Sequence, residues 1–177
     1  GRSSKGNLVT KNYISKIEQR EVGGSTLAAR KIWWDEVVSR LNNDERGQFL
    51  GSFKGDDKIL TIYKSGKYLI SGFELSIKFN DDLIHIEKWH PNRPVACVYW
   101  NPQKELFFVK RFLVEKLTKK HSFIDDDCEL IVASTGYKPK VNVTFNKRLK
   151  ETKDLTDKVY ELNDIIDVKG DKAQGNQ

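Results

Sequence analysis

The 177-residue sequence contains no methionine, only two cysteines and only three histidines. Cys97 and Cys128 are too few for a disulfide framework and too far apart for a metal-binding pair, so we expect both to be buried and reduced. No stretch approaches the roughly 18 apolar residues of a membrane helix, and no basic-then-apolar leader opens the chain. We therefore expect a cytoplasmic protein without a membrane segment. Because methionine is missing even at position 1, we also expect the chain to be a piece of a longer protein.

Residue patterns that carry enzymatic chemistry are also missing. His85 and His90 flank Glu87, but a zinc-protease pair needs histidines four residues apart on a helix, and these lie five apart in a strand-like run. The stretch 64–67, Lys-Ser-Gly-Lys, lacks the upstream glycine and the following hydroxyl residue of a phosphate-binding loop. No Gly-x-Ser-x-Gly motif occurs. We therefore expect a non-catalytic chain that holds no metal and no cofactor of its own.

Positive charge is abundant and unevenly distributed. The net charge is +6, which favours an anionic partner. Residues 1–16 contain four basic side chains and no acid, and residues 138–150 contain five basic side chains and no acid. Lysines and arginines that recur along one margin of a protein bind a polyanion through its phosphates, without reading sequence. Lysines at hairpin tips that only keep sheet edges unpaired are the alternative explanation.

The middle of the sequence predicts β-hairpins. Residues 59–73 hold two runs rich in β-branched and aromatic residues around Ser65-Gly66, and residues 95–112 repeat this pattern around Asn101-Pro102. A third hairpin is expected over residues 129–145, broken at Thr135-Gly136 and Lys138-Pro139. Hairpins that recur every 35 or so residues are typical of the blades of a propeller-like array.

The two ends of this middle region are less clearly patterned. Residues 31–42 are compatible with a short helix or with strands, and residues 48–53 resemble a further strand. Residues 151–171 hold seven acids, and their apolar spacing suits a short amphipathic helix as well as it suits a solvated connector. We predict an all-β protein of about four four-stranded blades. Residues 1–150 form the blades, and residues 151–177 form an acidic connector and the start of the next blade within the same domain.

The N-terminal residues carry a resemblance to a known family. Gly1, Gly6 and Asn7 have the same spacing as Gly170, Gly175 and Asn176. The run Lys5-Gly6-Asn7-Leu8-Val9-Thr10-Lys11, followed by Gln19-Arg20-Glu21-Val22-Gly23-Gly24-Ser25, resembles the C-terminal domain of the A subunit of bacterial type IIA topoisomerases, DNA gyrase and topoisomerase IV. The second run departs from the gyrase box, with Glu21 in place of an arginine and Ser25 in place of a lysine. Residues 30–75 look like topoisomerase IV in particular.

The resemblance implies a fold and a function. The fold would be a β-pinwheel, a propeller-like disc that binds and bends duplex DNA on its basic perimeter. The parent would be an ATP-dependent topoisomerase that works with a B subunit at the nucleoid. Its DNA-cleaving tyrosine and its ATP and Mg²⁺ sites would lie outside this chain. The rival interpretation is a propeller-type module for protein–protein contact that binds no nucleic acid.

The candidate DNA-binding side chains are basic residues of successive blades. Trp33, Trp34, Trp89 and Trp100 are expected to pack between strands, because a duplex offers no unstacked bases to receive them. The predicted DNA contacts are Lys5, Lys11, Arg20, Arg30, Lys31, Arg46, Lys110, Arg111, Lys138, Lys147 and Arg148.

Overall fold

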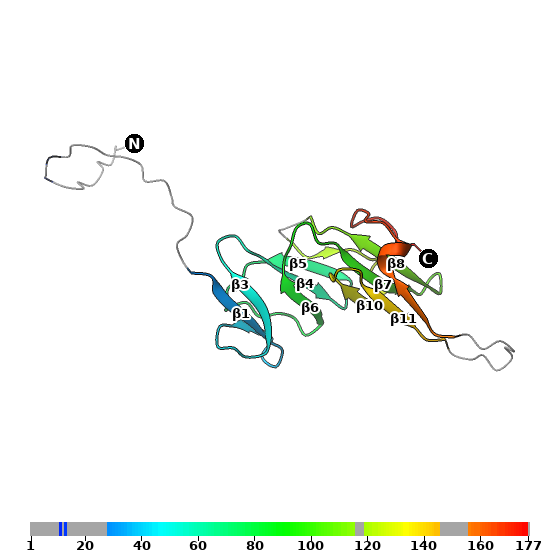
Figure 1. Ribbon diagram of the computed structural model, residues 1–177, viewed down its shortest axis with the longest axis horizontal. Coiled ribbons are helices and arrows are strands. Elements are labelled where there is room, and N and C mark those ends of the chain that lie inside the picture. Colours follow the sequence, from blue (N-terminus) through cyan, green and yellow to red (C-terminus); the bar gives the residue numbers. More distant parts are fainter. Residues whose placement is uncertain (1–10, 12, 14–27, 116–118, 146–155, 177) are drawn as a thin grey trace, which may run out of the picture.

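The computed structural model describes residues 11, 13, 28–115, 119–145 and 156–176, and these form short antiparallel sheets with almost no helix (Figure 1). The all-β prediction is confirmed. No helix of the described residues is long and apolar enough to cross a membrane. The elements are β1 (Arg30–Asp35), β2 (Arg40–Asn42), β3 (Gln48–Phe53), β4 (Ile59–Tyr63), β5 (Lys67–Ser71), β6 (Leu83–Lys88), β7 (Val95–Asn101), β8 (Leu106–Phe112), β9 (His121–Ser122), β10 (Glu129–Ser134), β11 (Lys140–Val143), β12 (Lys158–Glu161) and α1 (Leu162–Ile165).

The strands form four sheets. Their orders are β2-β1-β3 in the first, β6-β4-β5-β9 in the second, β10-β7-β8 in the third and β11-β12 in the fourth. The hairpins predicted around Ser65-Gly66 and Asn101-Pro102 are confirmed as β4–β5 and β7–β8. The hairpin predicted over residues 129–145 is wrong. Its two runs are strands, but β10 pairs with β7, whereas β11 pairs with β12.

The first three sheets share one order of strands. In each, the first strand of a hairpin lies between its hairpin partner and a third strand that comes later in the chain, namely β3, β6 or β10. The second strand of each hairpin then pairs with a segment from further along the chain. Lys78 bridges Arg40 of β2, β9 pairs with β5, and residues 169–176 form bridges with β8. Each sheet therefore receives its fourth segment from the next repeat of the pattern.

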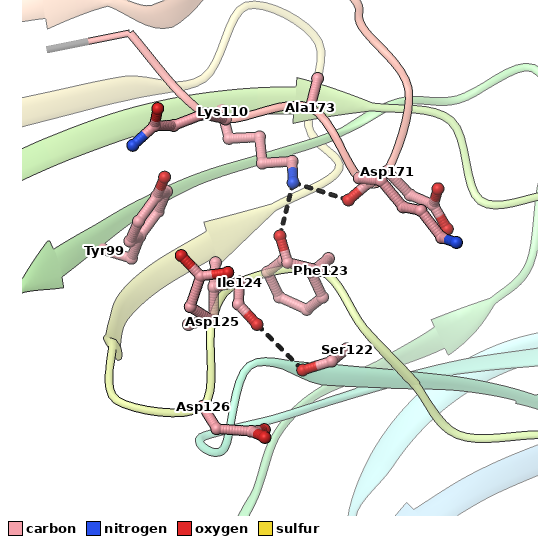
Figure 2. Close-up of a pocket in the computed structure, with 11 residues that line it drawn as sticks. Tyr99, Lys110, Ser122, Phe123, Ile124, Asp125, Asp126, Asp171 and Ala173 are labelled. Atoms are coloured by element: carbon pink, nitrogen blue, oxygen red, sulfur yellow. Dashed lines mark hydrogen bonds between the residues drawn. The ribbon is translucent and has the colours of Figure 1, made fainter.

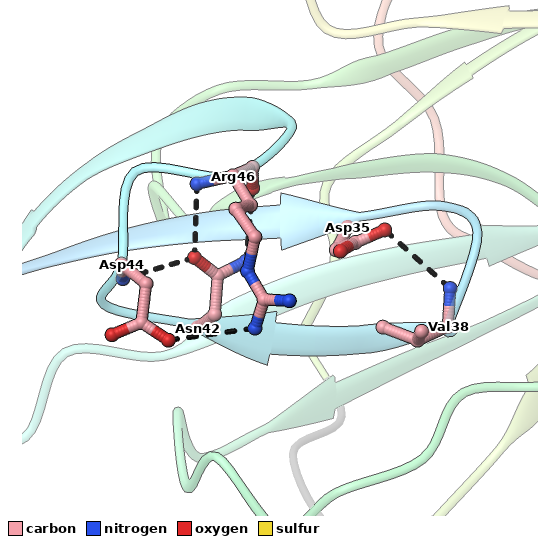
Figure 3. A network of polar contacts seen from close by, with 5 residues as sticks. All are labelled: Asp35, Val38, Asn42, Asp44 and Arg46. Carbon is pink, nitrogen blue, oxygen red and sulfur yellow. Dashed lines mark hydrogen bonds and ion pairs between the residues drawn. The ribbon is translucent and has the colours of Figure 1, made fainter.

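Residues 31–42, compatible with either helix or strand in the sequence, form the β1–β2 hairpin. Ile32 and Trp34 alternate toward the core, as the period of a strand requires. Trp33 lies on the opposite face, with its ring 4.9 Å from that of Phe49 on β3. The Asp35 carboxylate accepts a hydrogen bond from the backbone N–H of Val38 at the turn (Figure 3). Strand periodicity thus explains the local burial where the sequence left two alternatives open.

Two hydrophobic cores hold the sheets together. The first sheet packs against the second through a cluster that includes Ile32, Phe53 and Ile59, and the second packs against the third through a larger cluster that includes Leu60 and Phe112. Strand β4 is buried along its whole length because it serves both cores. This explains its continuous run of apolar and β-branched residues.

The last described part of the chain belongs to the sheets as well. β12 pairs with β11 over four residues, and the short helix α1 follows it directly. The helix has only four residues and begins at Leu162, which is buried. The sequence left open a short amphipathic helix or a solvated connector over residues 151–171, and residues 158–165 form a strand followed by a four-residue helix. Residues 151–155 lie outside the described part of the chain.

Candidate nucleic-acid interface

Basic side chains recur where the first strand of each hairpin begins. Arg30 and Lys31 open β1, and Lys58 immediately precedes β4. Arg93 lies two residues before β7, and the fourth hairpin has Lys138 before β11 and Lys140 as its first residue. We refer to these six residues as the strand-start cations. Each of the four hairpins contributes at least one, so positive charge is repeated with the fold.

A proline helps to set this position in the last two hairpins. Arg93-Pro94 leads into β7, and Lys138-Pro139 leads into β11. Proline lacks a backbone N–H and is tolerated at the start of a strand, where no ladder hydrogen bond is lost. The preceding residue is held in extended or turn conformations. Lys138 departs from this preference, with a φ of 54° in the left-handed region that few non-glycine residues adopt.

The strand-start cations differ in whether they already form an ion pair with a carboxylate. The Lys138 ammonium lies 3.3 Å from the carboxylate of Glu161, and the Arg93 guanidinium lies 3.8 Å from that of Glu87. The carboxylate of Glu161 raises the pKa of Lys138. Within the described residues, Arg30, Lys31, Lys58 and Lys140 make no ion pair. Arg30, Lys31 and Lys140 are also exposed, whereas Lys58 is half-buried, so the first three are the most available to an anion.

Lys110, one of the predicted DNA contacts, is placed inside the protein. Its side chain is 3% exposed, and its ammonium donates hydrogen bonds to the backbone carbonyls of Phe123 and Asp171 (Figure 2). The second of these bonds is 2.6 Å long. Burial lowers the pKa of Lys110. The sequence places Lys110 near the end of a predicted strand, where we expected an exposed side chain. In the structure, the side chain joins β8 to two later segments and offers no charge to a ligand.

Other predicted contacts are found at or near the surface. Arg30, Lys31, Lys138 and Lys11 are exposed. Arg46 is exposed and lies 3.4 Å from Asp44, next to Asn42, whose side-chain oxygen accepts hydrogen bonds from the backbone N–H groups of Asp44 and Arg46 (Figure 3).

Arg111 is half-buried, and its guanidinium donates a hydrogen bond of 3.0 Å to the carbonyl of Ile166. This contact uses the side chain to hold the segment after α1. Four predicted contacts lie outside the described residues: Lys5, Arg20, Lys147 and Arg148.

Three of the strand-start cations were absent from the predicted set. They are Lys58, Arg93 and Lys140. Lys58 follows two aspartates, so the local net charge there is not positive. Arg93 has no basic neighbour and therefore forms no visible cluster. The signal that would have found them is position: each comes within two residues of the start of a hairpin.

A polar pocket of about 530 Å³ lies beside Lys110 and is lined in part by Asp125, Asp126 and Asp171 (Figure 2). Its carboxylates repel phosphate, and the lysine ammonium is already engaged by carbonyls. Among the described residues, no three His, Cys, Asp or Glu side chains lie so that they could hold a metal ion. The pocket therefore does not extend the basic surface.

Repeated antiparallel sheets, each opened by a basic residue, define an all-β repeat protein with basic residues at recurring positions. Residues 40–177 match the topoisomerase C-terminal domain of Bacteroidota, and the chain belongs to this family. The resemblance seen in the sequence is thereby confirmed at the level of a topoisomerase C-terminal domain. No curated protein and no solved structure gives a significant match.

Proposed function

We propose that this domain binds duplex DNA through the strand-start cations and bends it, on behalf of a type IIA topoisomerase of the topoisomerase IV kind. The observation that carries the proposal is the recurrence of basic residues at the same place in all four hairpins of a topoisomerase C-terminal domain, exposed in three of them and half-buried at Lys58 in the second. Contacts to phosphates supply affinity through release of counterions and carry no sequence information. The binding is therefore independent of sequence.

The proposed architecture is a β-pinwheel in which each hairpin and its third strand form one blade. The repeated strand order and the fourth segment received from the next repeat support this assignment. Blades arranged around an axis bring equivalent positions to one rim. On such a rim the strand-start cations follow a curved path, and a duplex that contacts several of them bends.

In the parent enzyme, the bent segment would be presented for ATP-dependent strand passage. The cleavage tyrosine, the Mg²⁺ and ATP sites and the B subunit belong to that parent and act outside this chain. The role of this domain is positional, because it determines which DNA segments meet. An electrostatic grip suits this role, since it holds DNA of any sequence and releases it readily.

Filter binding with short duplexes and with plasmid tests the proposal. We expect log affinity to fall linearly with log salt concentration, with a slope of about −0.9 for each phosphate contacted. Duplexes of unrelated sequence should bind with affinities within about twofold of one another. Ligase-mediated circularisation of short fragments should be faster in the presence of the domain, because bending brings the ends together.

Binding that does not change between low and moderate salt would contradict the proposal. So would a strong preference for one duplex sequence, because it would indicate readout of base edges. If the domain binds no duplex under any of these conditions, the rival function of protein–protein contact remains.

A further inference from the structure

Tyr137 lies in the short loop between β10 and β11. Its side chain is 91% exposed, and of the described aromatic residues only Tyr13 is more exposed. Packing of the described residues therefore makes almost no use of this ring. A single exposed apolar side chain is ordinary, but this one comes directly before the strand-start cation Lys138.

The loop that carries Tyr137 is anchored on both sides. The hydroxyl of Thr135, which is 4% exposed, donates a hydrogen bond of 2.7 Å to the carboxylate of Glu87 on β6. On the other side, the carbonyl of Pro139 accepts a hydrogen bond of 2.9 Å from the backbone N–H of Leu162. Because the chain is held two residues before and two residues after Tyr137, the exposed ring has a fixed place on the surface.

The backbone beside Tyr137 is also strained. Lys138 has the left-handed φ described above, although the proline that follows it favours extended conformations for this residue. Left-handed non-glycine residues persist only where the surrounding structure imposes them, and they cluster at sites that bind ligands. Strain of this kind is expected where a protruding side chain is preorganised for a contact.

Positive charge follows the ring closely. Lys138 and Lys140 are exposed strand-start cations that come one and three residues after Tyr137. A ligand that satisfies both the cations and the ring must combine negative charge with flat apolar surfaces. Duplex DNA has both, because its phosphates lie outside and its stacked bases present aromatic faces to a side chain that separates them.

The described strand starts carry only one ring of this kind. The residue directly before the first strand-start cation is Ala29 in the first hairpin, Asp57 in the second and Asn92 in the third. The fourth hairpin alone has an aromatic residue in this place, which is Tyr137. A contact made by this ring would therefore act at one point along a bound duplex, whereas the cations act along its length.

We propose that Tyr137 is a wedge that enters between neighbouring base pairs of the bound duplex and kinks the DNA at the fourth hairpin. The inference rests on the proposed DNA binding and adds the residue that localises the bend. A duplex offers no unstacked base, so the ring enters by opening a base step, as inserted apolar side chains do in other proteins that bend DNA. The free energy lost from base stacking is offset by contact of the ring with the bases and by the protein surface that the kinked duplex reaches. Removal of the ring should therefore change the bend far more than the affinity.

Two measurements on the intact chain separate bending from binding. Ligase-mediated circularisation of short fragments reports bending, and filter binding at several salt concentrations reports affinity and the number of phosphate contacts. In Tyr137→Ala, we expect the stimulation of circularisation to fall at least about threefold. The affinity should stay within about threefold and the salt slope should be unchanged, because no cation is removed. Tyr137→Phe keeps the ring and should behave as the parent chain does.

Phe107→Ala is the matched control. The Phe107 ring is 57% exposed, but it pairs with Trp100 near the turn between β7 and β8, away from the strand starts. This variant should stimulate circularisation within about twofold of the parent chain. Circular dichroism and urea unfolding establish that all three variants are folded.

A short duplex that contains several 2-aminopurine bases reports the opened step directly, because the fluorescence of this base rises when it unstacks. At saturation, the parent chain and Tyr137→Phe should raise the fluorescence, and Tyr137→Ala should raise it less. Two results overturn the proposal: Tyr137→Ala that circularises DNA and raises the fluorescence as the parent chain does, or Tyr137→Phe that loses bending as fully as Tyr137→Ala. Either result leaves salt-dependent binding in place and so spares the proposed function, whereas a parent chain that binds no duplex would overturn both.

Discussion

The ammonium group of Lys110 on β8 donates a hydrogen bond of 2.6 Å to the backbone carbonyl of Asp171, sixty-one residues later in the chain. The hydroxyl of Tyr68 on β5 in turn donates a hydrogen bond of 3.0 Å to the side-chain carboxylate of Asp171. A buried lysine and a buried tyrosine from two neighbouring sheets thus bind one residue of the segment that completes the third sheet. This segment is part of the fold and is held by specific side chains.

Lys110→Met should destabilise the domain without affecting DNA binding. Methionine preserves the aliphatic packing but leaves the carbonyls of Phe123 and Asp171 without their donor, a loss of about 1–3 kcal/mol in the free energy of unfolding. The measurement is urea unfolding, with hydrogen exchange of the Lys169 amide, which donates to Arg111, as the local readout. Lys119→Met, at an exposed position, is the control and should stay within about 0.5 kcal/mol. A marked loss of DNA affinity in folded Lys110→Met would contradict the internal role.

The two glycines of the same segment offer a matched pair of variants. A Cβ at Gly175 would lie 2.5 Å from the carbonyl oxygen of Val109, whereas a Cβ at Gly170 would meet nothing within 4 Å. Gly175→Ala should therefore push the segment off the β8 edge, at a cost of about 1–3 kcal/mol. Gly170→Ala should be neutral or slightly stabilising.

Hydrogen exchange of the Val109 amide reports this displacement directly. The backbone N–H groups of Val109 and Asn176 each donate a hydrogen bond of 2.8 Å to the carbonyl of the other residue. The amide should lose protection in Gly175→Ala and retain it in Gly170→Ala. Equal behaviour of the two variants would show that the close approach at Gly175 does not limit the fit.

The sequence predicted local features of the fold better than the pairing between distant segments. The β4–β5 and β7–β8 hairpins follow from turn residues between β-rich runs, which is local information. By contrast, β10 lies in the same kind of run yet pairs back onto β7, a partner that no local signal in the sequence identifies. The glycine frame at residues 170–176 was visible as a repeat, but its contact with β8 depends on the position of Val109. Burial of Lys110 was equally hidden, since its partners are backbone carbonyls from distant segments.

Stability at low pH should depend on Glu87, which links the second and third sheets. Its carboxylate accepts a 2.7 Å hydrogen bond from Thr135 on the loop after β10 and lies 3.6 Å from the His85 imidazole. Burial alone would raise the pKa of Glu87, but His85, Thr135 and the charge of Arg93 together bring it below its ordinary value of 4.5. The folded state thus binds the Glu87 proton more weakly than the unfolded state does.

The stabilisation from ionised Glu87 is therefore fully present above pH 4.5 and is lost as the pH falls through the lower pKa of the folded state. Glu87→Gln removes this contribution. As the pH is lowered from 5, the urea concentration at the midpoint of unfolding should therefore decline less for Glu87→Gln than for the parent chain. Glu36→Gln, at an exposed position, should retain the parent slope. Identical slopes for the parent chain and Glu87→Gln would mean that another carboxylate controls acid stability.

The Cys97 thiol should be inert in the folded protein. It is fully buried, and burial raises its pKa to about 12. Since the thiolate is the reactive form, modification by Ellman's reagent at pH 8 should be about a thousandfold slower than for an unfolded thiol. Cys97→Ala allows the reaction of Cys128 to be measured separately. Rapid modification of Cys97 without denaturant would show that the core between the second and third sheets opens readily.

Charge reversal at the strand-start cations should weaken binding to every duplex by a similar factor. Lys31→Glu, Lys58→Glu and Lys140→Glu alter three hairpins at residues that make no ion pair within the described part of the chain, so little internal contact is lost. Each variant should reduce the magnitude of the salt slope by about 0.9 if its side chain contacts one phosphate. Lys104→Glu is the matched control, because Lys104 is exposed at the turn between β7 and β8, away from the strand starts, and also makes no ion pair among the described residues. If Lys104→Glu lowers affinity as much as the other three, DNA responds to net charge and the strand starts form no particular path. If the three variants lower affinity for one sequence only, the contacts read bases, and the electrostatic mechanism is wrong.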